Sequence, residues 1–136
     1  MKQQLSLTRR ERDCVITIQE NSSKDFPIRL SSLAKLMDLK PPTVIEILKK
    51  LEVKGFVSRE KGMVVLTPSG KQRYNFIVNC HRILETIFFD SGVDLDEACR
   101  EVSAFDYMID SDSAMKLSKF VGKPSSCPHG KPILYG

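Results

Sequence analysis

The sequence predicts a mainly α-helical protein, with an N-terminal winged helix-turn-helix that has a two-stranded wing, a long connecting helix and a C-terminal helical domain. Three observations predict this class. Apolar residues recur at helical spacing over most of the chain, and only residues 56–66 change to a period near two. Two consecutive prolines, Pro41 and Pro42, separate a pair of short helical patterns. One long helical pattern then runs from Thr67 towards Gly92, which is long enough to connect two domains.

Composition excludes several protein classes. A chain of 136 residues with 41% hydrophobic residues has room for one globular unit or two small lobes. No apolar run approaches the ~20 residues needed to span a bilayer, and no secretory stretch follows Met1, so we expect a cytoplasmic protein without a membrane partner. The four cysteines form no Cys-x-x-Cys pair, which argues against a disulfide framework or a zinc ribbon.

Charge is unevenly distributed along the chain. Residues 1–73 carry 15 Lys and Arg against 8 Asp and Glu, a net charge of +7, whereas residues 74–136 carry 6 against 9, a net charge of −3. A basic N-terminal half suits contact with phosphates of nucleic acid. The charge pattern therefore indicates two domains with different tasks.

Two helices are predicted before the prolines. The first should begin after Thr8, because Thr8 and Glu11 have the spacing of a capping box, and it should end in the polar stretch 21–24. The second is short, and either Ser31 or Ser32 can cap its N-terminus by accepting free amide hydrogens. Its apolar positions are Leu33, Leu36 and Leu39.

The next helix should start near Pro42, because proline excludes the preceding residue from the helical region yet suits the first turn of a helix. Its apolar stripe consists of Val44, Ile47, Leu48 and Leu51. Gly55 can end the helix in the left-handed conformation. In a helix-turn-helix the second helix enters the major groove of DNA, so the polar side of this helix is the candidate recognition face.

A hairpin should follow, because residues 56–59 and 63–66 flank a tight-turn composition at positions 60–62. This wing should have Arg59 and Lys61 at its tip, and the whole block predicts double-stranded DNA as a partner. We expect four residues near base edges, namely Lys40, Pro42, Thr43 and Glu46, and four on phosphates, namely Lys49, Lys50, Arg59 and Lys61. The alternative is a packing module used for dimerisation or protein contact.

The second half of the chain should be helical. The long helix has Thr67 as its cap and ends near Gly92, and two more helices are predicted over 94–108 and 111–121. The tail 123–132 has too many prolines for a helix and should be a loop or strap. Beside the apolar stripe of the helix over 94–108 lies a second stripe formed by Cys99, Ser103 and Asp106.

A histidine and a carboxylate interrupt the apolar seam of the long helix. His81 and Glu85 are four residues apart, so both side chains can bind one divalent ion. The alternative is an intrahelical hydrogen bond between them. Cys99 and Asp106 would add a thiolate and a carboxylate if their helix packs there, and Asp13 of the first helix another oxygen. Taken singly, Cys99 can equally be a small buried side chain and Asp106 a solvated acid.

Other motifs indicate no further site. Cys127 and His129 are one residue apart in the tail, and we interpret them as incidental polar residues of a loop outside the metal site. The chain contains no GxSxG, P-loop, GxGxxG or HExxH pattern, so it gives no positive sign of catalysis or of a small-molecule substrate.

With these elements placed, the chain resembles the diphtheria toxin repressor family of iron- and manganese-dependent transcriptional repressors. The resemblance extends from about Leu7 to Ile133. The features that carry it are, in chain order, Pro42-Thr43-Val44, residues 66–71 (LTPSGK), residues 81–85 (HRILE), Gly92-Val93-Asp94 and residues 127–133 (CPHGKPI). The resemblance implies a winged-helix DNA-binding domain over 1–72 and a dimerisation and metal-binding domain over 73–136, without the SH3-like third domain of longer members.

The resemblance also implies ligand positions. His81 and Glu85 match two ligands of the ancillary metal site of the family, and Cys99 falls where that site usually has a histidine. In another register, Asp96-Glu97-Ala98-Cys99-Arg100 matches an identical string in some members, which makes Cys99 a ligand of the second site.

For that second site, Asp13 matches the ligand of the N-terminal helix in manganese-type members, and Asp106 replaces a glutamate. The chain departs from the family twice, because Ser103 stands where a cysteine or glutamate is expected and Tyr107 where a histidine is expected.

The function implied by the resemblance is that of a homodimeric repressor of metal-homeostasis genes, activated for operator binding by Fe(II) or Mn(II). Zn(II) and Co(II) also suit a site that contains cysteine. One alternative is a metal-independent or thiol-responsive regulator with a degenerate site, in which Cys80 and Cys99 are the sensors. A second alternative is a metalloenzyme with an open coordination position among His81, Glu85 and Cys99.

Overall fold

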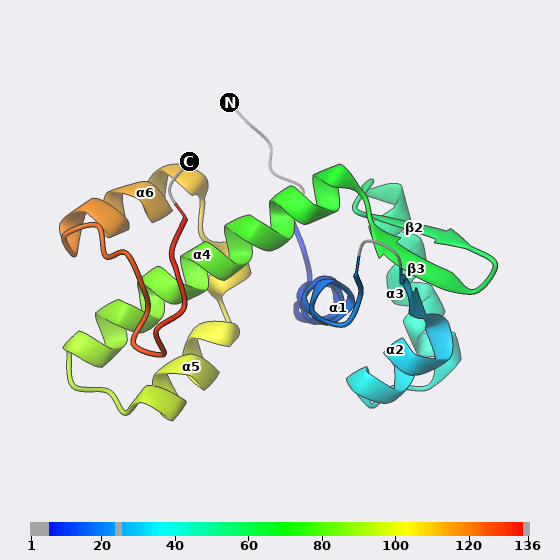
Figure 1. Ribbon diagram of the computed structural model, residues 1–136, viewed down its shortest axis with the longest axis horizontal. Coiled ribbons are helices and arrows are strands. Elements are labelled where there is room, and N and C mark those ends of the chain that lie inside the picture. The colour runs from blue at the N-terminus through cyan, green and yellow to red at the C-terminus, as the bar shows by residue number, and fades with distance from the viewer. Residues whose placement is uncertain (1–5, 24–25, 135–136) are drawn as a thin grey trace. The chain divides into compact units, whose positions relative to one another are not determined.

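The computed structural model describes residues 6–23 and 26–134. Residues 1–5 of the predicted first domain, Lys24 of the polar stretch after the first helix and the last two residues of the second domain lie outside the described residues. In chain order the elements are α1 (Arg9–Glu20), β1 (Ile28–Arg29), α2 (Leu30–Met37), α3 (Pro41–Val53), β2 (Val57–Glu60), β3 (Met63–Leu66), α4 (Pro68–Asp90), α5 (Leu95–Ser103), the 3-10 helix η1 (Asp106–Met108) and α6 (Ser111–Phe120) (Figure 1).

The predicted mainly helical class, a winged helix-turn-helix followed by a helical domain, is confirmed. The chain divides into two compact units, one ending at Tyr74 and the other starting at Asn75. The long helix α4 runs through this division.

The capping box predicted at the start of α1 is present. The hydroxyl of Thr8 accepts from the amide of Glu11 at 3.1 Å, and the amide of Thr8 donates to the Glu11 carboxylate at 2.9 Å. Glu11 is buried, and its Oε1 also accepts from Lys54 Nζ at 2.6 Å. One carboxylate therefore caps α1 and holds it to the C-terminal end of α3.

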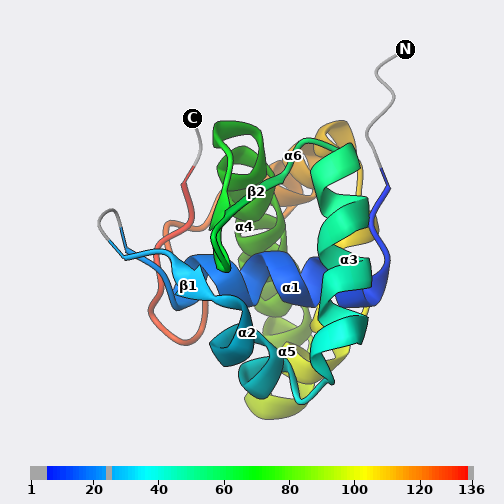
Figure 2. The same cartoon turned by 90° about the vertical axis from the view of Figure 1, so that its right-hand side faces the viewer.

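The helix-turn-helix forms with two corrections. Figure 2 shows α1, α2 and α3 together in the N-terminal unit. Neither Ser31 nor Ser32 caps α2, because β1 leads directly into the helix and Arg29 takes the cap position. Leu33 is buried whereas Leu36 is 55% exposed, so the apolar stripe of α2 is narrower than the spacing of the leucines indicates.

The recognition helix α3 starts at Pro41, one residue before the predicted start, with Lys40 as its N-cap. Gly55 has a φ of +80°, which is the left-handed conformation predicted for it. The amide of Gly55 donates to the Glu52 carbonyl at 2.9 Å, which satisfies one carbonyl of the last turn.

The wing is a hairpin in a sheet of three strands rather than two. Glu60 pairs with Met63, which leaves Lys61 and Gly62 as a two-residue turn with positive φ at both positions. Strand β1 pairs with the other edge of β3, so the strand order is β1-β3-β2. Sequence analysis missed β1 because a strand of two residues is too short to show a period.

The C-terminal unit packs α4, α5 and α6 around one apolar core. Its buried members are Cys80, Leu84, Val102 and Ala114. In Figure 1, α5 and α6 lie on opposite sides of the C-terminal part of α4, and the tail crosses this helix. The predicted helix over 94–108 is wrong in its length: α5 ends at Ser103, and Phe105, with φ −145° and ψ 1°, separates it from η1.

The proline-rich tail forms no helix, as predicted, and lies as a strap on α4. The side chain of Asn79 donates to the carbonyl of Leu134 and accepts from its amide, both at 3.1 Å. Ile133 is buried, which adds an apolar anchor. Among the described residues, no helix has both the length and the apolar character needed to cross a membrane.

The first turn of α4 gives a test of this packing. A Cβ at Gly70 would lie 2.0 Å from the carbonyl oxygen of Phe56, so Gly70→Ala forces the wing and the helix apart. We expect the free energy of unfolding to fall by about 1–3 kcal/mol, although alanine normally stabilises a helix relative to glycine. Urea denaturation measures the change, with Ser69→Ala at the exposed neighbouring position as the control. A stabilised Gly70→Ala variant would contradict this account.

Candidate metal centre

Three potential metal ligands converge between α4 and α5. His81 and Glu85 lie one turn apart on the same face of α4, with His81 Nε2 at 3.1 Å from Glu85 Oε2. Cys99 of α5 places its sulfur 3.5 Å from the same nitrogen. One ligand atom from each of these side chains lies within 4.8 Å of the others. Nitrogen, carboxylate oxygen and sulfur are thus gathered at the spacing of ligands around one ion.

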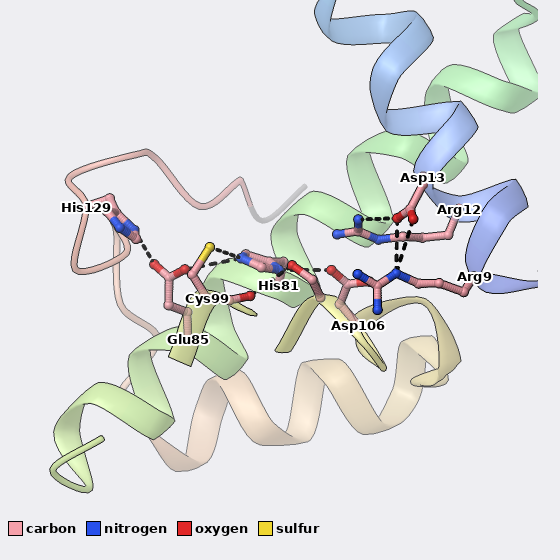
Figure 3. A network of polar contacts seen from close by, with 9 residues as sticks. Arg9, Arg12, Asp13, His81, Glu85, Cys99, Asp106 and His129 are labelled. Carbon is pink, nitrogen blue, oxygen red and sulfur yellow. Dashed lines mark hydrogen bonds and ion pairs between the residues drawn. The ribbon is translucent and has the colours of Figure 1, made fainter. Parts of the chain in front are cut away.

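Glu85 is the most deeply buried of the three, with 1% of the residue exposed. Each oxygen of its carboxylate contacts a different imidazole. Oε2 contacts His81, and Oε1 lies 2.7 Å from Nδ1 of His129 in the tail. Figure 3 shows His81 and His129 on opposite sides of Glu85. A buried carboxylate needs such partners, because an isolated buried charge is strongly unfavourable.

Asp106 orients the imidazole of His81. Its Oδ2 lies 2.9 Å from Nδ1 of His81, and Asp106 is completely buried (Figure 3). A neutral imidazole has one N–H and can donate to only one of these two carboxylates; when the N–H is on Nδ1 and donates to Asp106, Nε2 has a lone pair that can bind a metal ion beside Glu85 and Cys99. A carboxylate on the second nitrogen of a histidine is the arrangement that orients histidine ligands in metal sites.

The tail contributes to a second group of potential ligands. Glu85, Cys127 and His129 offer three ligand atoms that also lie within 4.8 Å of one another. The local sequence explains the turn that carries them: the Cys127 carbonyl accepts from the amide of Gly130 at 2.8 Å, and Gly130 has a φ of +83°. Pro128 is the second residue of this turn, a position that favours proline because its ring fixes φ at a suitable value.

The interpretation of Cys127 and His129 as incidental loop residues therefore missed this arrangement. No helical or strand spacing connects the tail with α4, since 44 residues separate Glu85 from His129. The signal that could have indicated them is the CPHGKPI string, which is one of the features that carry the family resemblance.

The two other predicted ligands, Asp13 and Asp106, and Ser103, which replaces a ligand of the family, have different surroundings. Asp13 belongs to α1 in the N-terminal unit, where Arg9 and Arg12 contact its Oδ1 at 3.2 Å and 2.9 Å. Ser103 donates its hydroxyl to the carbonyl of Cys99 at 2.8 Å, which occupies the hydroxyl in the last turn of α5. Asp106 belongs to neither group of three ligand atoms. Roles of Asp13 and Asp106 as ligands stay predictions.

The cysteines differ in their access to solvent. Burial, reinforced by Asp106, raises the pKa of Cys80 to about 12, and burial with Glu11 and Asp13 does the same for Cys14. Burial, followed by Glu85, also raises the pKa of Cys99, but this side chain is only half-buried. Cys80 is 2% exposed and therefore poorly suited to the sensor role suggested for it in a thiol-responsive regulator.

The predicted DNA-contacting residues lie on α3 and the wing. Exposed positions among them are Lys40, Pro42, Glu46, Lys49, Lys50 and Lys61. Thr43 and Arg59 are half-buried. Arg59 is not at the wing tip: it pairs opposite Val64, and its Nη2 lies 2.7 Å from Oε1 of Glu52 on α3. Contact of these residues with DNA stays a prediction.

Comparison with known proteins gives two family matches. Residues 67–135 match the model described as iron dependent repressor, metal binding and dimerisation domain. Residues 7–62 match the model of the MarR family. The first match covers α4, α5, α6 and the tail, and therefore includes both groups of potential ligands.

Individual relatives agree with these matches. An uncharacterized HTH-type transcriptional regulator of Aeropyrum pernix is 33% identical over 108 residues, which are 78% of this chain and 59% of the relative. The crystal structure of a hypothetical protein from Sulfolobus solfataricus has a TM-score of 0.84 and 32% identity, covering 95% of this chain and 100% of the other. A manganese-dependent transcriptional repressor in complex with manganese has a TM-score of 0.76 and 27% identity, covering 93% of this chain and 59% of the repressor. The chain thus spans about three fifths of the first and third of these proteins.

Alkylation of the cysteines tests their arrangement. In the folded, chelator-treated protein at pH 7.5, we expect iodoacetamide to modify Cys99 before Cys14 and Cys80, because the reagent must reach the sulfur atom. Peptide mass spectrometry over time measures the order of modification, and the protein unfolded in guanidinium, in which all four cysteines should react alike, is the control. Equal rates for Cys80 and Cys99 in the folded protein would contradict the burial described here.

Proposed function

We propose that this chain, which belongs to the iron-dependent repressor family, is a homodimeric transcriptional repressor whose operator binding requires a divalent metal ion. The observation that carries the proposal is the convergence of His81, Glu85 and Cys99 within the matched metal-binding and dimerisation domain. The family model, the Aeropyrum pernix relative and the manganese-dependent repressor are described as regulators rather than enzymes, so the metalloenzyme alternative has no support.

The side chains at this centre fit a divalent transition metal. A carboxylate oxygen, a thiol sulfur and an imidazole nitrogen suit Fe(II), Zn(II) and Co(II), and the oxygen and nitrogen also suit Mn(II). Glu85 is buried, and its two carboxylate oxygens contact the imidazoles of His81 and His129. A cation bound beside Glu85 would compensate the negative charge of this carboxylate. When bound, the metal supplies a fixed positive charge shared by ligands from α4 and α5.

Coordination would link the two helices. His81 and Glu85 belong to α4 and Cys99 belongs to α5, so common coordination favours the arrangement in which all three side chains converge. Asp106 keeps His81 Nε2 directed towards this point. The helix α4 begins in the N-terminal unit and ends in the C-terminal unit. Metal binding that fixes the C-terminal half of α4 would therefore act on the DNA-binding residues through the same helix. The DNA-binding form is favoured by the difference in metal affinity between the two arrangements, and by no more than that.

DNA would be read by α3. In a dimer, two such helices enter successive major grooves about 34 Å apart on a near-palindromic operator. Lys49, Lys50 and Lys61 are exposed and would contact phosphates, while Thr43 and Glu46 near the start of α3 would face base edges. Arg59 would have to share its guanidinium between Glu52 and a phosphate.

Metal dependence is the first test. We expect duplex DNA, selected from a random pool by the metal-loaded protein, to bind at least about 10-fold more tightly with Fe(II) or Mn(II) than with chelator, since coupling of this kind is typically 5–150-fold. His81→Ala should remove the difference, and the exposed Glu101→Gln variant should keep it. Fluorescence anisotropy measures both affinities. Equal affinity with metal and with chelator would refute the proposed mechanism.

Salt dependence tests the DNA face. Lys50→Ala should weaken binding to all duplexes to a similar extent and reduce the slope of log K against log[salt] by about 1, because one phosphate contact is lost. Lys116→Ala, at an exposed position of α6, is the matched control and should leave the slope unchanged. If Lys50→Ala behaves like Lys116→Ala, α3 does not lie on DNA as proposed.

A further inference from the structure

A cavity of about 460 Å³ lies between α4 and α6 in the C-terminal unit. Its apolar lining comes from both helices and from the tail, and consists of Phe76, Cys80, Ile83, Ala114, Met115 and Leu134. Pockets that bind small molecules have volumes of roughly 300–1,000 Å³, and they are mostly apolar with a few polar groups that fix the ligand. The cavity therefore has the size and the lining of a ligand site.

This cavity is separate from the proposed metal centre. On α4 its lining residues Phe76, Cys80 and Ile83 follow one another at spacings of four and three, so they form one stripe of the helix. Among the described residues, no member of either group of potential metal ligands lines the cavity. The helix α4 thus presents different side chains to the cavity and to the metal centre.

One polar side chain in the wall of the cavity lacks a hydrogen-bond partner. Ser118 of α6 is 2% exposed, and its Oγ forms no hydrogen bond with the described residues. A serine in a helix can donate to the carbonyl four residues earlier, as Ser91 does to that of Ile87 at 2.7 Å. Because an unpaired buried hydroxyl is unfavourable, the Ser118 hydroxyl is suited to contact a ligand.

The charged side chains that line the cavity are basic. Lys119 in the last turn of α6 and Lys123 shortly after it both belong to the lining, and none of the described lining residues is acidic. The carbonyl of Ser118 accepts from the amide of Lys123 at 2.7 Å, so a backbone group caps the end of α6. Two full positive charges also exceed the partial negative charge of a helix C-terminus, which is about half an elementary charge. This end of the cavity therefore favours an anionic group.

The cavity is elongated. Its lining extends along α6 from Ser111 to Lys119, eight residues that span about 12 Å at a rise of ~1.5 Å per residue. The basic residues lie at one end of this length and the apolar residues follow it. An amphipathic molecule with a linear apolar chain and one anionic end matches this distribution better than a compact aromatic acid.

We propose that the cavity between α4 and α6 binds a medium-chain fatty acid. The carboxylate would accept hydrogen bonds from the Ser118 hydroxyl and from the ammonium groups of Lys119 and Lys123. The alkyl chain would lie against Phe76 and Ile83, where it is removed from water. This inference goes beyond the proposed function, because it requires neither metal nor DNA.

Calorimetric titration with sodium decanoate tests the inference. The full chain is titrated in chelator at pH 7.5, without DNA and below the concentration at which decanoate forms micelles. We expect saturable binding of one decanoate per chain. Decanol should bind at least about 10-fold more weakly, because it cannot form hydrogen bonds between opposite charges with the lysines. Decyltrimethylammonium, which has the same chain and the opposite charge, should not bind.

Matched variants locate the site. Lys119→Gln should weaken decanoate binding by about 10-fold, whereas Lys116→Gln, at an exposed lysine of α6 outside the cavity lining, should leave it unchanged. Ser118→Ala should weaken decanoate binding by about 3–10-fold through loss of one hydrogen bond. Circular dichroism verifies that each variant is folded, and the comparison of decanoate with decanol on the unchanged chain decides the inference even if a variant does not fold.

Absence of saturable binding, equal affinity for decanoate and decanol, or unchanged affinity in Lys119→Gln would overturn the fatty-acid site. Sedimentation velocity identifies one alternative: if decanoate does not bind and Met115→Lys converts a dimer into monomers, a second copy of the chain covers this cavity. These outcomes leave the proposed function untouched, since metal-dependent operator binding is measured separately. A chain that binds decanoate and recognises DNA equally well with chelator refutes only the metal-dependent repressor.

Discussion

The negative charge of a carboxylate buried in the C-terminal unit needs partners close by. Glu85 is such a carboxylate, and its partners come from α4 and from the tail. Removing an ionised group from water costs several kcal/mol unless hydrogen bonds or opposite charges replace the water. His129 from the tail can donate to Glu85, and His81 from its own helix can donate either to Glu85 or to Asp106. Because Asp106 occupies the other nitrogen of His81, the requirement extends to the segment after α5. The helix α4, the segment after α5 and the tail therefore meet near Glu85. Cys99 and Cys127 lie in the same region.

The same helix that carries Glu85 also begins in the winged unit. Thr67 caps α4 by accepting from the amide of Gly70 at 3.0 Å, and Gly70 lies against the backbone of Phe56 at the start of the wing. No other residue type fits at Gly70 without displacing that backbone. A continuous helix thus links the proposed DNA-binding residues with the proposed metal ligands, and the coupling proposed between them would act through this helix.

Local rules predicted most of the fold. The capping box at Thr8, the left-handed Gly55 and the cap at Thr67 each depend on a few neighbouring residues, and the sequence contains those residues. Strand β1 was missed because two residues are too few to show a period and because its partner, β3, is distant in sequence. The early end of α5 was missed because the apolar stripe continues past Ser103. The same reasoning found His81 and Glu85, which share a helix, but placed Cys127 and His129 outside the site, since only tertiary structure brings the tail to Glu85. Local spacing cannot reveal a group of potential ligands that is completed by a contact across 44 residues.

The proposed metal site around Glu85 can be examined by anomalous diffraction from crystals grown with Zn(II), with data on both sides of the zinc absorption edge. We expect anomalous density within bonding distance of Glu85 and of His81 Nε2, with Asp106 still on Nδ1 of His81. Anomalous density confined to other surfaces, with His81 and Glu85 in direct contact and free of metal, would contradict it.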